Sequence, residues 1–363
     1  KKPGVADIFR DIEYQAKKPS GGDKHIGNFF KALLSNDEIR FKIKNLIEEV
    51  CQERKNIESP TTYAHLTFLL FRAVQYLKLY GSGRYENIHY IDSLRSIEDW
   101  RNMILEILDK RRQELIDLLV HRRVVSNIVA RYAGIAAVIN LFYPEEQISI
   151  IDLGCSSHQG VRKIMQVSKG VLRFAPIKDH TPKRLISRFM NKKIYLKKGV
   201  GVDQNDFTVN IDIEWLLACS HYPCQLRDIP ELRSRLEKLK STPNTPFIRT
   251  DLRNLDLYFK KGEFKVAIFS SVLYQMTPPE RLEVFKEAYQ LLSEDGIVLI
   301  QENAEKQDND LLITEDIGEP YSYALFAVGP RTDNKVWEIL RYRDNRCSEV
   351  KAGRDFNKLI HLK

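Results

Sequence analysis

The pattern of hydrophobic and polar positions divides the chain into two parts near residue 145. In the first part, apolar residues recur three and four positions apart with charged residues between them, as in stretches 28–56 and 93–142. This spacing is typical of amphipathic helices that bury one face. Neither strand alternation nor a repeat of fixed period occurs there. We therefore expect an all-helical N-terminal domain over residues 1–145, acting as a cap or substrate domain.

From about Gln147, short apolar runs replace the helical spacing. The stretches QISIIDLG, KGVGVDQND, PFIRTDLRN, FKVAIFSSV and GIVLIQEN all end in polar or acidic residues. Such runs are typical of strands buried on both faces of a parallel sheet, and helical stretches separate them. After Tyr321, two longer strands with a polar turn between them predict a terminal antiparallel hairpin. The order predicts an α/β fold with a doubly wound sheet, whose ligands bind at the carboxyl ends of the strands.

Composition favours a globular protein away from membranes. The chain has 363 residues, of which 43% are hydrophobic and 29% charged, and its apolar runs are too short to cross a bilayer. Its first residues, KKPGVADIFRDIEYQ, are charged and lack the apolar core of a secretory signal. Five cysteines, an odd number, do not suggest a disulfide framework. We therefore expect a cytoplasmic protein with no membrane contact.

One close cluster of metal-ligand types occurs, in the stretch CSHYPC. It contains Cys219, His221 and Cys224, and no second pair lies nearby in the sequence to complete a four-ligand zinc site. We expect no metal at this position.

The stretch IIDLGCSSHQG, residues 150–160, has the form of a strand that passes through a glycine-bearing turn into a helix. Such a turn presents free backbone N–H groups, and Gly154 allows the main chain to approach a ligand closely. The spacing does not fit a dinucleotide fingerprint, because Ser156 and Gln159 occupy its second and third glycine positions. A phosphate-binding P-loop string is also absent from the sequence.

Two more acids follow at the ends of later strands. Asp203 ends the apolar run of GVGVDQND, where a carboxylate can accept hydrogen bonds from ribose hydroxyls. Asp251 follows the next strand, in FIRTDLRN. With Asp152, these acids are expected to converge on one nucleotide-sized groove.

With these motifs the chain resembles the class I S-adenosylmethionine-dependent methyltransferases over roughly Val125 to Arg343. IIDLGCSSHQG is similar to that family's first motif, an apolar strand followed by D-x-G-x-G-x-G, and the strongest part runs from Phe264 to Ile300. The resemblance implies a Rossmann-like catalytic domain over 146–363 with a seven-strand sheet, the hairpin supplying strands six and seven. It also implies insertions at about 170–198 and 207–243.

The resemblance further implies a set of site residues. Those expected to bind the cofactor S-adenosylmethionine are Asp152, Gly154, Cys155 and Ser156 around its methionine part, Asp203 and Gln204 at the ribose, Asp251 and Leu252 at the adenine, and Ser270, Ser271 and Val272 below the sulfonium. The candidates for catalysis are Glu302, Tyr274 and His158. Each candidate also has a structural interpretation: a loop-binding carboxylate for Glu302, packing or a lid for Tyr274, and an exposed helix start for His158.

The implied reaction is methyl transfer to an oxygen or nitrogen of a small molecule or peptide. A second hypothesis is an RNA methyltransferase that uses the basic stretch KDHTPKRLISRFMNKKIYLKKG, residues 178–199, in which Phe189 and Tyr195 are interleaved. Such a stretch is more often the solvated face of an amphipathic helix, and the net charge of +8 does not decide between them. A third hypothesis is a binding or scaffold protein that keeps the fold without turnover. The sequence predicts no oligomeric state.

Overall fold

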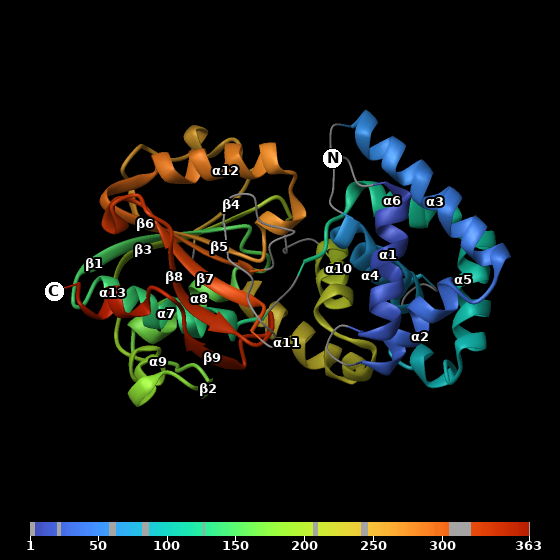
Figure 1. Cartoon of the computed structure of the whole chain (residues 1–363), viewed down its shortest axis with the longest axis horizontal. Helices are drawn as coiled ribbons and strands as arrows, with labels where there is room; N and C mark the ends of the chain where they lie inside the picture. Colours follow the sequence, from blue (N-terminus) through green and yellow to red (C-terminus); the bar gives the residue numbers. More distant parts are fainter. Residues whose placement is uncertain are drawn as a thin grey trace. The chain divides into compact units, whose positions relative to one another are not determined.

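The computed structural model describes residues 4–19, 23–57, 63–81, 87–125, 128–205, 210–240, 246–304 and 321–362. The chain forms two compact units, shown in Figure 1: residues 1–126 together with 207–241, and residues 127–206 together with 242–363. We call them the helical unit and the α/β unit.

All the regular elements that the structure describes in the helical unit are helices. They are α1 (Val5–Lys17), α2 (Lys24–Leu33), α3 (Asp37–Asn56), α4 (Tyr63–Tyr80), η2 (Tyr90–Ser93), α5 (Ile97–Lys110), α6 (Arg112–His121), α10 (Asn210–Ser220), η4 (Pro223–Asp228) and α11 (Ile229–Lys240). Side chains cap several of these helices: Asn36 accepts a hydrogen bond from the Ile39 N–H at 3.0 Å, and Ser96 accepts one from the Asp99 N–H at 3.1 Å. No described helix is both long and apolar enough to span a membrane.

Helix α10 packs within the helical unit, although its sequence lies between two strands of the other unit. The end of α10 is held by α4: Gln75 Nε2 donates to the carbonyls of Ala218 and His221, at 2.6 and 2.9 Å. Its residues Ile213 and Trp215 are buried in the core of this unit. The insertion expected at about 207–243 is therefore part of the helical unit in space. The structure also divides the chain at residue 126 and not at 145, because the next helix, apolar on all sides, packs under the sheet.

The cysteine cluster lies at the end of α10. Cys219 and His221 are buried there, and His221 Nδ1 lies 3.2 Å from the Leu217 carbonyl. Among the residues that the structure describes, no group of three or more His, Cys, Asp or Glu side chains is placed to hold a metal ion.

The α/β unit is built on one mixed sheet of nine strands. The strands are β1 (Gln147–Leu153), β2 (Lys178–Asp179), β3 (Tyr195–Asp203), β4 (Phe247–Arg249), β5 (Phe264–Ser270), β6 (Leu292–Asn303), β7 (Tyr323–Val328), β8 (Trp337–Tyr342) and β9 (Glu349–Ala352). Their order is β2-β9-β8-β7-β6-β5-β1-β3-β4. Strands β4, β3, β1, β5 and β6 are parallel, whereas β7, β8 and β9 each run antiparallel to the strand before them in the chain.

The expected count of seven strands is wrong by two. The additional strands, β2 and β9, pair with each other at one edge of the sheet and have only two and four residues. Strands this short show no hydrophobic alternation, so the sequence pattern could not reveal them.

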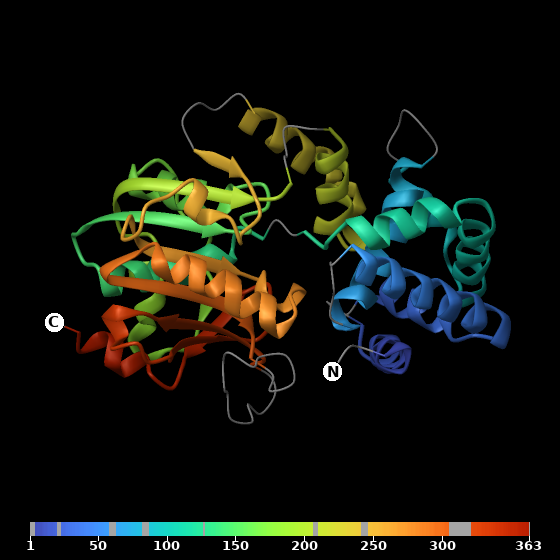
Figure 2. The ribbon, with the colours of Figure 1, turned by 90° about the horizontal axis from the view of Figure 1, so that it is seen from above.

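The order of the parallel strands creates a point where the winding reverses. Strand β1 has β3 on one side and β5 on the other, so the loops after β1 and β5 leave toward opposite faces of the sheet. Figures 1 and 2 show α7 (Arg131–Phe142) and α8 (Gln159–Ser168) on one face, with α9 (Leu185–Phe189) and α13 (Phe356–Ile360), and α12 (Pro278–Gln290) on the other. The remaining short helices are η3 (Pro182–Arg184), η5 (Leu255–Leu257), η6 (Leu273–Gln275) and η7 (Pro330–Thr332).

Two cores cover the two faces of the sheet. Ile150 and Ile268 belong to the core under α7 and α8, whereas their neighbours Ile151 and Phe269 belong to the core under α12. This alternation is the period of two expected for a strand buried on both faces.

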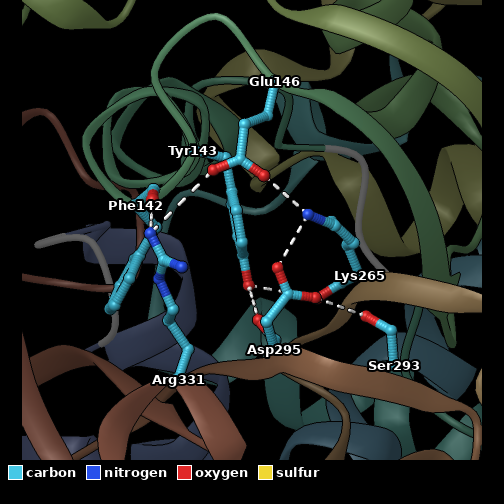
Figure 3. Close-up of polar contacts among 7 residues, drawn as sticks. All are labelled: Phe142, Tyr143, Glu146, Lys265, Ser293, Asp295 and Arg331. Atoms are coloured by element: carbon cyan, nitrogen blue, oxygen red, sulfur yellow. Dashed lines mark hydrogen bonds and ion pairs between the residues drawn. The ribbon is translucent and has the colours of Figure 1, made fainter.

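A polar network, drawn in Figure 3, joins the amino ends of the central parallel strands. Lys265, near the start of β5, forms ion pairs with Glu146 at 2.6 Å and with Asp295 at 2.7 Å. The Tyr143 hydroxyl donates to the Asp295 carbonyl at 2.8 Å, and the Lys265 and Arg331 cations lie 5.3 and 5.4 Å from the centre of the Tyr143 ring. The network fixes the ends of the strands opposite to the rim at which ligands are expected.

Candidate functional site

The loop after β1 has an unusual backbone. Gly154, Ser156 and His158 all have positive φ angles, of 70°, 51° and 57°. For the two residues that are not glycine, this conformation costs about 1–2 kcal/mol each. The loop is tied to β3, because the N–H groups of Gly154 and Cys155 both bond the Val202 carbonyl, at 2.8 and 3.1 Å. Strained backbone held in place by its surroundings is typical of ligand-binding sites.

Asp152 lies at the end of β1, beside Gly201 of β3, and is only 1% exposed. The Tyr132 hydroxyl, from the start of α7, lies 3.0 and 2.8 Å from its two carboxylate oxygens. Burial raises the pKa of Asp152 to about 7, although the hydrogen bond from Tyr132 opposes the rise. A Cβ atom at Gly160 would lie 2.0 Å from the Tyr132 ring, so the absence of a side chain there lets the ring reach Asp152.

Asp203 links the loops after β1 and β3. Its Oδ2 accepts the Ser156 N–H at 2.8 Å, and its Oδ1 accepts the backbone and side-chain N–H groups of Asn205, both at 3.0 Å. Burial raises the pKa of Asp203, and these hydrogen bonds oppose the rise. The donors to Asp203 thus come from both loops, and they hold its carboxylate in a fixed position at the end of β3.

Asp251 extends the row of acids to the end of β4. It accepts the Gln204 side-chain amide at 2.6 Å and a two-pronged bond from the Arg253 guanidinium at 3.0 and 2.9 Å. Burial acts to raise the pKa of Asp251, but the hydrogen bonds from Arg253 have the larger effect. The pKa of Asp251 therefore lies below its ordinary value. The neighbouring Leu252 is buried in the core under α12. The structure therefore brings Asp152, Asp203, Gln204 and Asp251 together along one rim of the sheet.

Several buried polar atoms in this loop have no hydrogen-bond partner among the described residues. They are Ser156 Oγ, both ring nitrogens of His158, and Gln159 Nε2. Buried polar groups are nearly always satisfied by protein, water or ligand, so these atoms are available to a water molecule or to a ligand.

His158 is not an exposed helix start, which corrects the structural interpretation of that residue. It is 2% exposed and packs against β3, where a Cβ atom at Gly201 would lie 2.0 Å from its Nδ1. Burial, and then the charge of Arg162, lower the pKa of His158 to about 3, so the ring is neutral near pH 7. Cys155 lies at the same place, with its sulfur 2.8 Å from that Cβ position. Both side chains lie under the loop, against the strand.

The loop after β5 is held by polar contacts. Ser270 Oγ donates to the Gln301 side chain at 3.1 Å, and Ser271, whose φ is 58°, hydrogen-bonds through its hydroxyl with that of Tyr323. Val272 lies against Gly154, where a Cβ atom would be 2.6 Å from its Cγ2. The loops after β1 and β5 therefore touch at the switch point of the sheet.

Glu302, at the end of β6, binds that same loop. Its Oε1 accepts the N–H groups of Val272 and Leu273, at 2.6 and 2.8 Å. Burial raises the pKa of Glu302 to about 7, and these backbone donors oppose the rise. The contacts match the structural interpretation, a carboxylate that holds a loop. Tyr274 lies half-buried in η6 after the same loop.

Two further residues of this region were not singled out from the sequence. Tyr132 holds Asp152, and the buried Arg131 donates from Nε to the Asn345 carbonyl at 2.7 Å, with its guanidinium 6.0 Å from the Tyr323 ring. Both residues lie at the start of α7, which is otherwise largely apolar. An arginine in such a helix is the one feature of the sequence that could have indicated a polar role for this position.

The sequence matches no protein-family model and no curated protein. Solved structures do match it. The plantazolicin methyltransferase BamL, in complex with a triazolic desmethylPZN analogue and S-adenosylhomocysteine, is 13% identical over 81% of this chain and 73% of its own, with a TM-score of 0.29. The PH0226 protein of Pyrococcus horikoshii OT3 is 15% identical over 64% and 80%, with a TM-score of 0.29.

An S-adenosylmethionine-dependent methyltransferase of Mesorhizobium loti is 15% identical over 48% of this chain and 56% of its own, with a TM-score of 0.26. The first solved structures that match are covered over 51%, 54% and 44% of their length. This chain thus spans about half of the length of those chains.

Proposed function

We propose that the α/β unit binds S-adenosylmethionine at the rim formed by the ends of β1, β3, β4 and β5. We further propose that it directs the methyl group to an oxygen or nitrogen of a small molecule or peptide. The observation that carries the proposal is the buried, unpartnered Ser156 Oγ beside Asp203, in a strained loop at the switch point of the sheet.

The residues at this rim fit the adenosyl part of such a cofactor. The Asp203 carboxylate can accept a hydrogen bond from a ribose hydroxyl, and Ser156 Oγ, which has no partner among the described residues, can both donate and accept nearby. Leu252 supplies an apolar contact beside Asp251 for a base. Arg253 is 45% exposed, and because exposed ion pairs are weak, its side chain can leave Asp251 when a ligand binds.

When bound, the cofactor supplies a methyl group on a sulfonium that is already a good leaving group. The protein then has to hold the acceptor in line and exclude water, which in the best cases lowers a barrier by roughly 7–11 kcal/mol. We propose that Glu302 contributes by positioning: it fixes the backbone of Val272 and Leu273, and through Val272 the turn at Gly154. Tyr274, half-buried in η6, is our candidate for contact with the acceptor.

Calorimetric titration with S-adenosylmethionine and with S-adenosylhomocysteine tests the binding step. We expect the Asp203→Asn variant to bind at least tenfold more weakly, because a hydrogen bond to a charged group contributes about 1.5–3 kcal/mol. Asp256→Asn, at an exposed aspartate in η5, is the matched control and should bind as the native chain does. Absence of binding to the native chain, or equal affinity of Asp203→Asn, contradicts the proposal.

A non-catalytic protein of this fold is the competing hypothesis. It shares the prediction for cofactor binding and differs in the next step. Incubation with radiolabelled S-adenosylmethionine and fractionated cell extract separates the two hypotheses. Only an enzyme transfers the labelled methyl group to an acceptor, and we expect Glu302→Ala to weaken that transfer.

A further inference from the structure

The positive charge of the chain is concentrated in residues 162–198, which we call the basic segment. It contains twelve lysines and arginines and a single acid, Asp179. Its net charge is therefore +11, whereas the whole chain carries +8, so the other 326 residues together carry −3. A general surplus of surface lysine does not explain this distribution.

Apart from Arg162 and Lys163 on α8, the cations of the basic segment do not lie along one amphipathic helix. Between the end of α8 and the start of β3, the chain forms only the two-residue strand β2, the three-residue η3 and the five-residue helix α9. Phe174, Ile186 and Met190 anchor it in the core under α7. Asn140 of α7 donates from Nδ2 to the Phe189 carbonyl at 3.0 Å. The segment is an ordered surface of irregular shape.

Asp179 shapes this surface through hydrogen bonds, and in the part of the chain that the structure describes it forms no ion pair with the cations of the segment. Its Oδ1 accepts the Thr181 N–H at 2.9 Å, and its Oδ2 accepts the N–H and hydroxyl of Ser187 at 3.2 and 3.3 Å. The turn that it fixes presents two cations in succession, Lys183 and Arg184, with φ angles of 62° and 50°.

Eight exposed cations of the segment have no carboxylate within ion-pair distance among the described residues: Lys169, Arg173, Lys183, Arg184, Arg188, Lys192, Lys193 and Lys197. Aromatic rings lie among them. Lys192 Nζ is 4.1 Å from the centre of the Phe189 ring, Lys193 Nζ is 4.9 Å from that of Tyr195, and Tyr195 is 41% exposed.

We propose that the basic segment binds a single-stranded nucleic acid, with the unpaired cations on its phosphates and Tyr195 stacked on a base. Unpaired cations follow a phosphate backbone, and exposed rings among them supply the stacking that an anionic lipid surface does not need. The inference goes beyond the proposed methyl transfer and does not depend on it, because the segment lies outside the row of acids that would hold the cofactor.

Fluorescence anisotropy with labelled single-stranded RNA and DNA of about 15 nucleotides tests the proposal, at several salt concentrations and without cofactor. The test variant is Lys183→Ala/Arg184→Ala/Arg188→Ala. The control, Lys261→Ala/Lys286→Ala/Lys335→Ala, removes the same charge from exposed lysines elsewhere in the α/β unit. We expect the test variant to bind at least tenfold more weakly and to reduce the slope of log K against log salt by about 2, since each phosphate contact contributes about 0.7. The control should stay within twofold of the native chain.

A second variant guards against loss of fold. Tyr195→Leu keeps every charge, and we expect it to weaken binding about fivefold or more without changing the salt slope, because stacking is worth about 1–3 kcal/mol per base. Equal losses in the two triple variants, or binding that salt does not affect, overturn the proposal. So does binding to phosphatidylserine vesicles in the absence of oligonucleotide binding, for which the exposed Val171 and Leu172 would be the membrane contacts. The affinity of the test variant for S-adenosylmethionine keeps the two proposals apart. If that affinity is unchanged, a result for the basic segment says nothing against cofactor binding at the rim.

Discussion

At the scale of single residues, the burial of Glu302 predicts how the unfolding free energy depends on pH. Its pKa is raised by burial to about 7, so the folded chain retains a proton that the unfolded chain releases above its ordinary pKa near 4.5. The unfolding free energy therefore falls as pH rises from about 5 to 7. We expect Glu302→Gln, which keeps one acceptor for the Val272 and Leu273 N–H groups, to lose this part of the pH dependence. Urea unfolding at pH 5, 6, 7 and 8 measures it.

The matched control for that experiment is Glu294→Gln, at an exposed glutamate of β6. It should follow the native pH dependence. Asp152 contributes in the same direction, since burial also raises its pKa to about 7. The native dependence should therefore be reduced in Glu302→Gln and not abolished, and a profile identical to the native one contradicts the assignment.

Local sequence predicted the residues at the strand ends better than their partners. An apolar run that ends in an acid is visible within eight residues, which is why Asp152, Asp203 and Asp251 could be placed on one rim. The partner of Asp152 is Tyr132, twenty positions earlier in an apolar helix, where a tyrosine looks like core packing. The burial of His158 depends on the missing side chain of Gly201, a contact that no local pattern contains.

At the scale of elements, the loop after β1 depends on Gly154. Alanine there must adopt a φ of 70° and place its Cβ 2.6 Å from Val272 Cγ2, on a stiff β-branched side chain. We expect Gly154→Ala to cost about 3 kcal/mol of unfolding free energy, from backbone strain and overpacking together, and to weaken cofactor binding.

Gly170→Ala is a matched comparison for that variant. Gly170 has a φ of 72°, but nothing lies within 4 Å of its Cβ position. It should cost about 1 kcal/mol, from strain alone, and leave cofactor binding unchanged. Equal losses of stability in the two variants, measured by urea unfolding, would show that Val272 does not press on the loop.

At the scale of the whole molecule, the network around Lys265 supports the α/β unit from the end opposite the rim. Lys265→Met leaves Asp295 without its ion pair and Glu146 with only the longer one to Arg331, at 3.9 Å. Because both carboxylates are partly exposed, we expect a loss of only about 1 kcal/mol. High salt should reduce the difference from the native chain. The measurement is urea unfolding followed by tryptophan fluorescence in a Trp100→Phe/Trp215→Phe background. Trp337 is then the remaining tryptophan, so the signal reports on unfolding of the α/β unit. Lys261→Met, at an exposed lysine, should show no shift.

The sequence predicted the α/β class and the parallel strands, because strands buried on both faces are continuous apolar runs. It did not predict β2 and β9, because β9 is held by pairing with β8, and β2 by pairing with β9, and neither strand has a pattern of its own. Nor did it predict that α10 packs with α4, more than 130 positions earlier, since a largely apolar helix without a distinct polar face specifies burial but no partner.

The space that Gly201 leaves for His158 restricts which residues can occur together at these two positions in homologous chains. A methyl group at position 201 would occupy the space of the imidazole, so the two sites cannot both carry a side chain of ordinary size. Among homologous chains, we therefore expect histidine at 158 to occur together with glycine at 201, and a larger residue at 201 to coincide with a small one at 158.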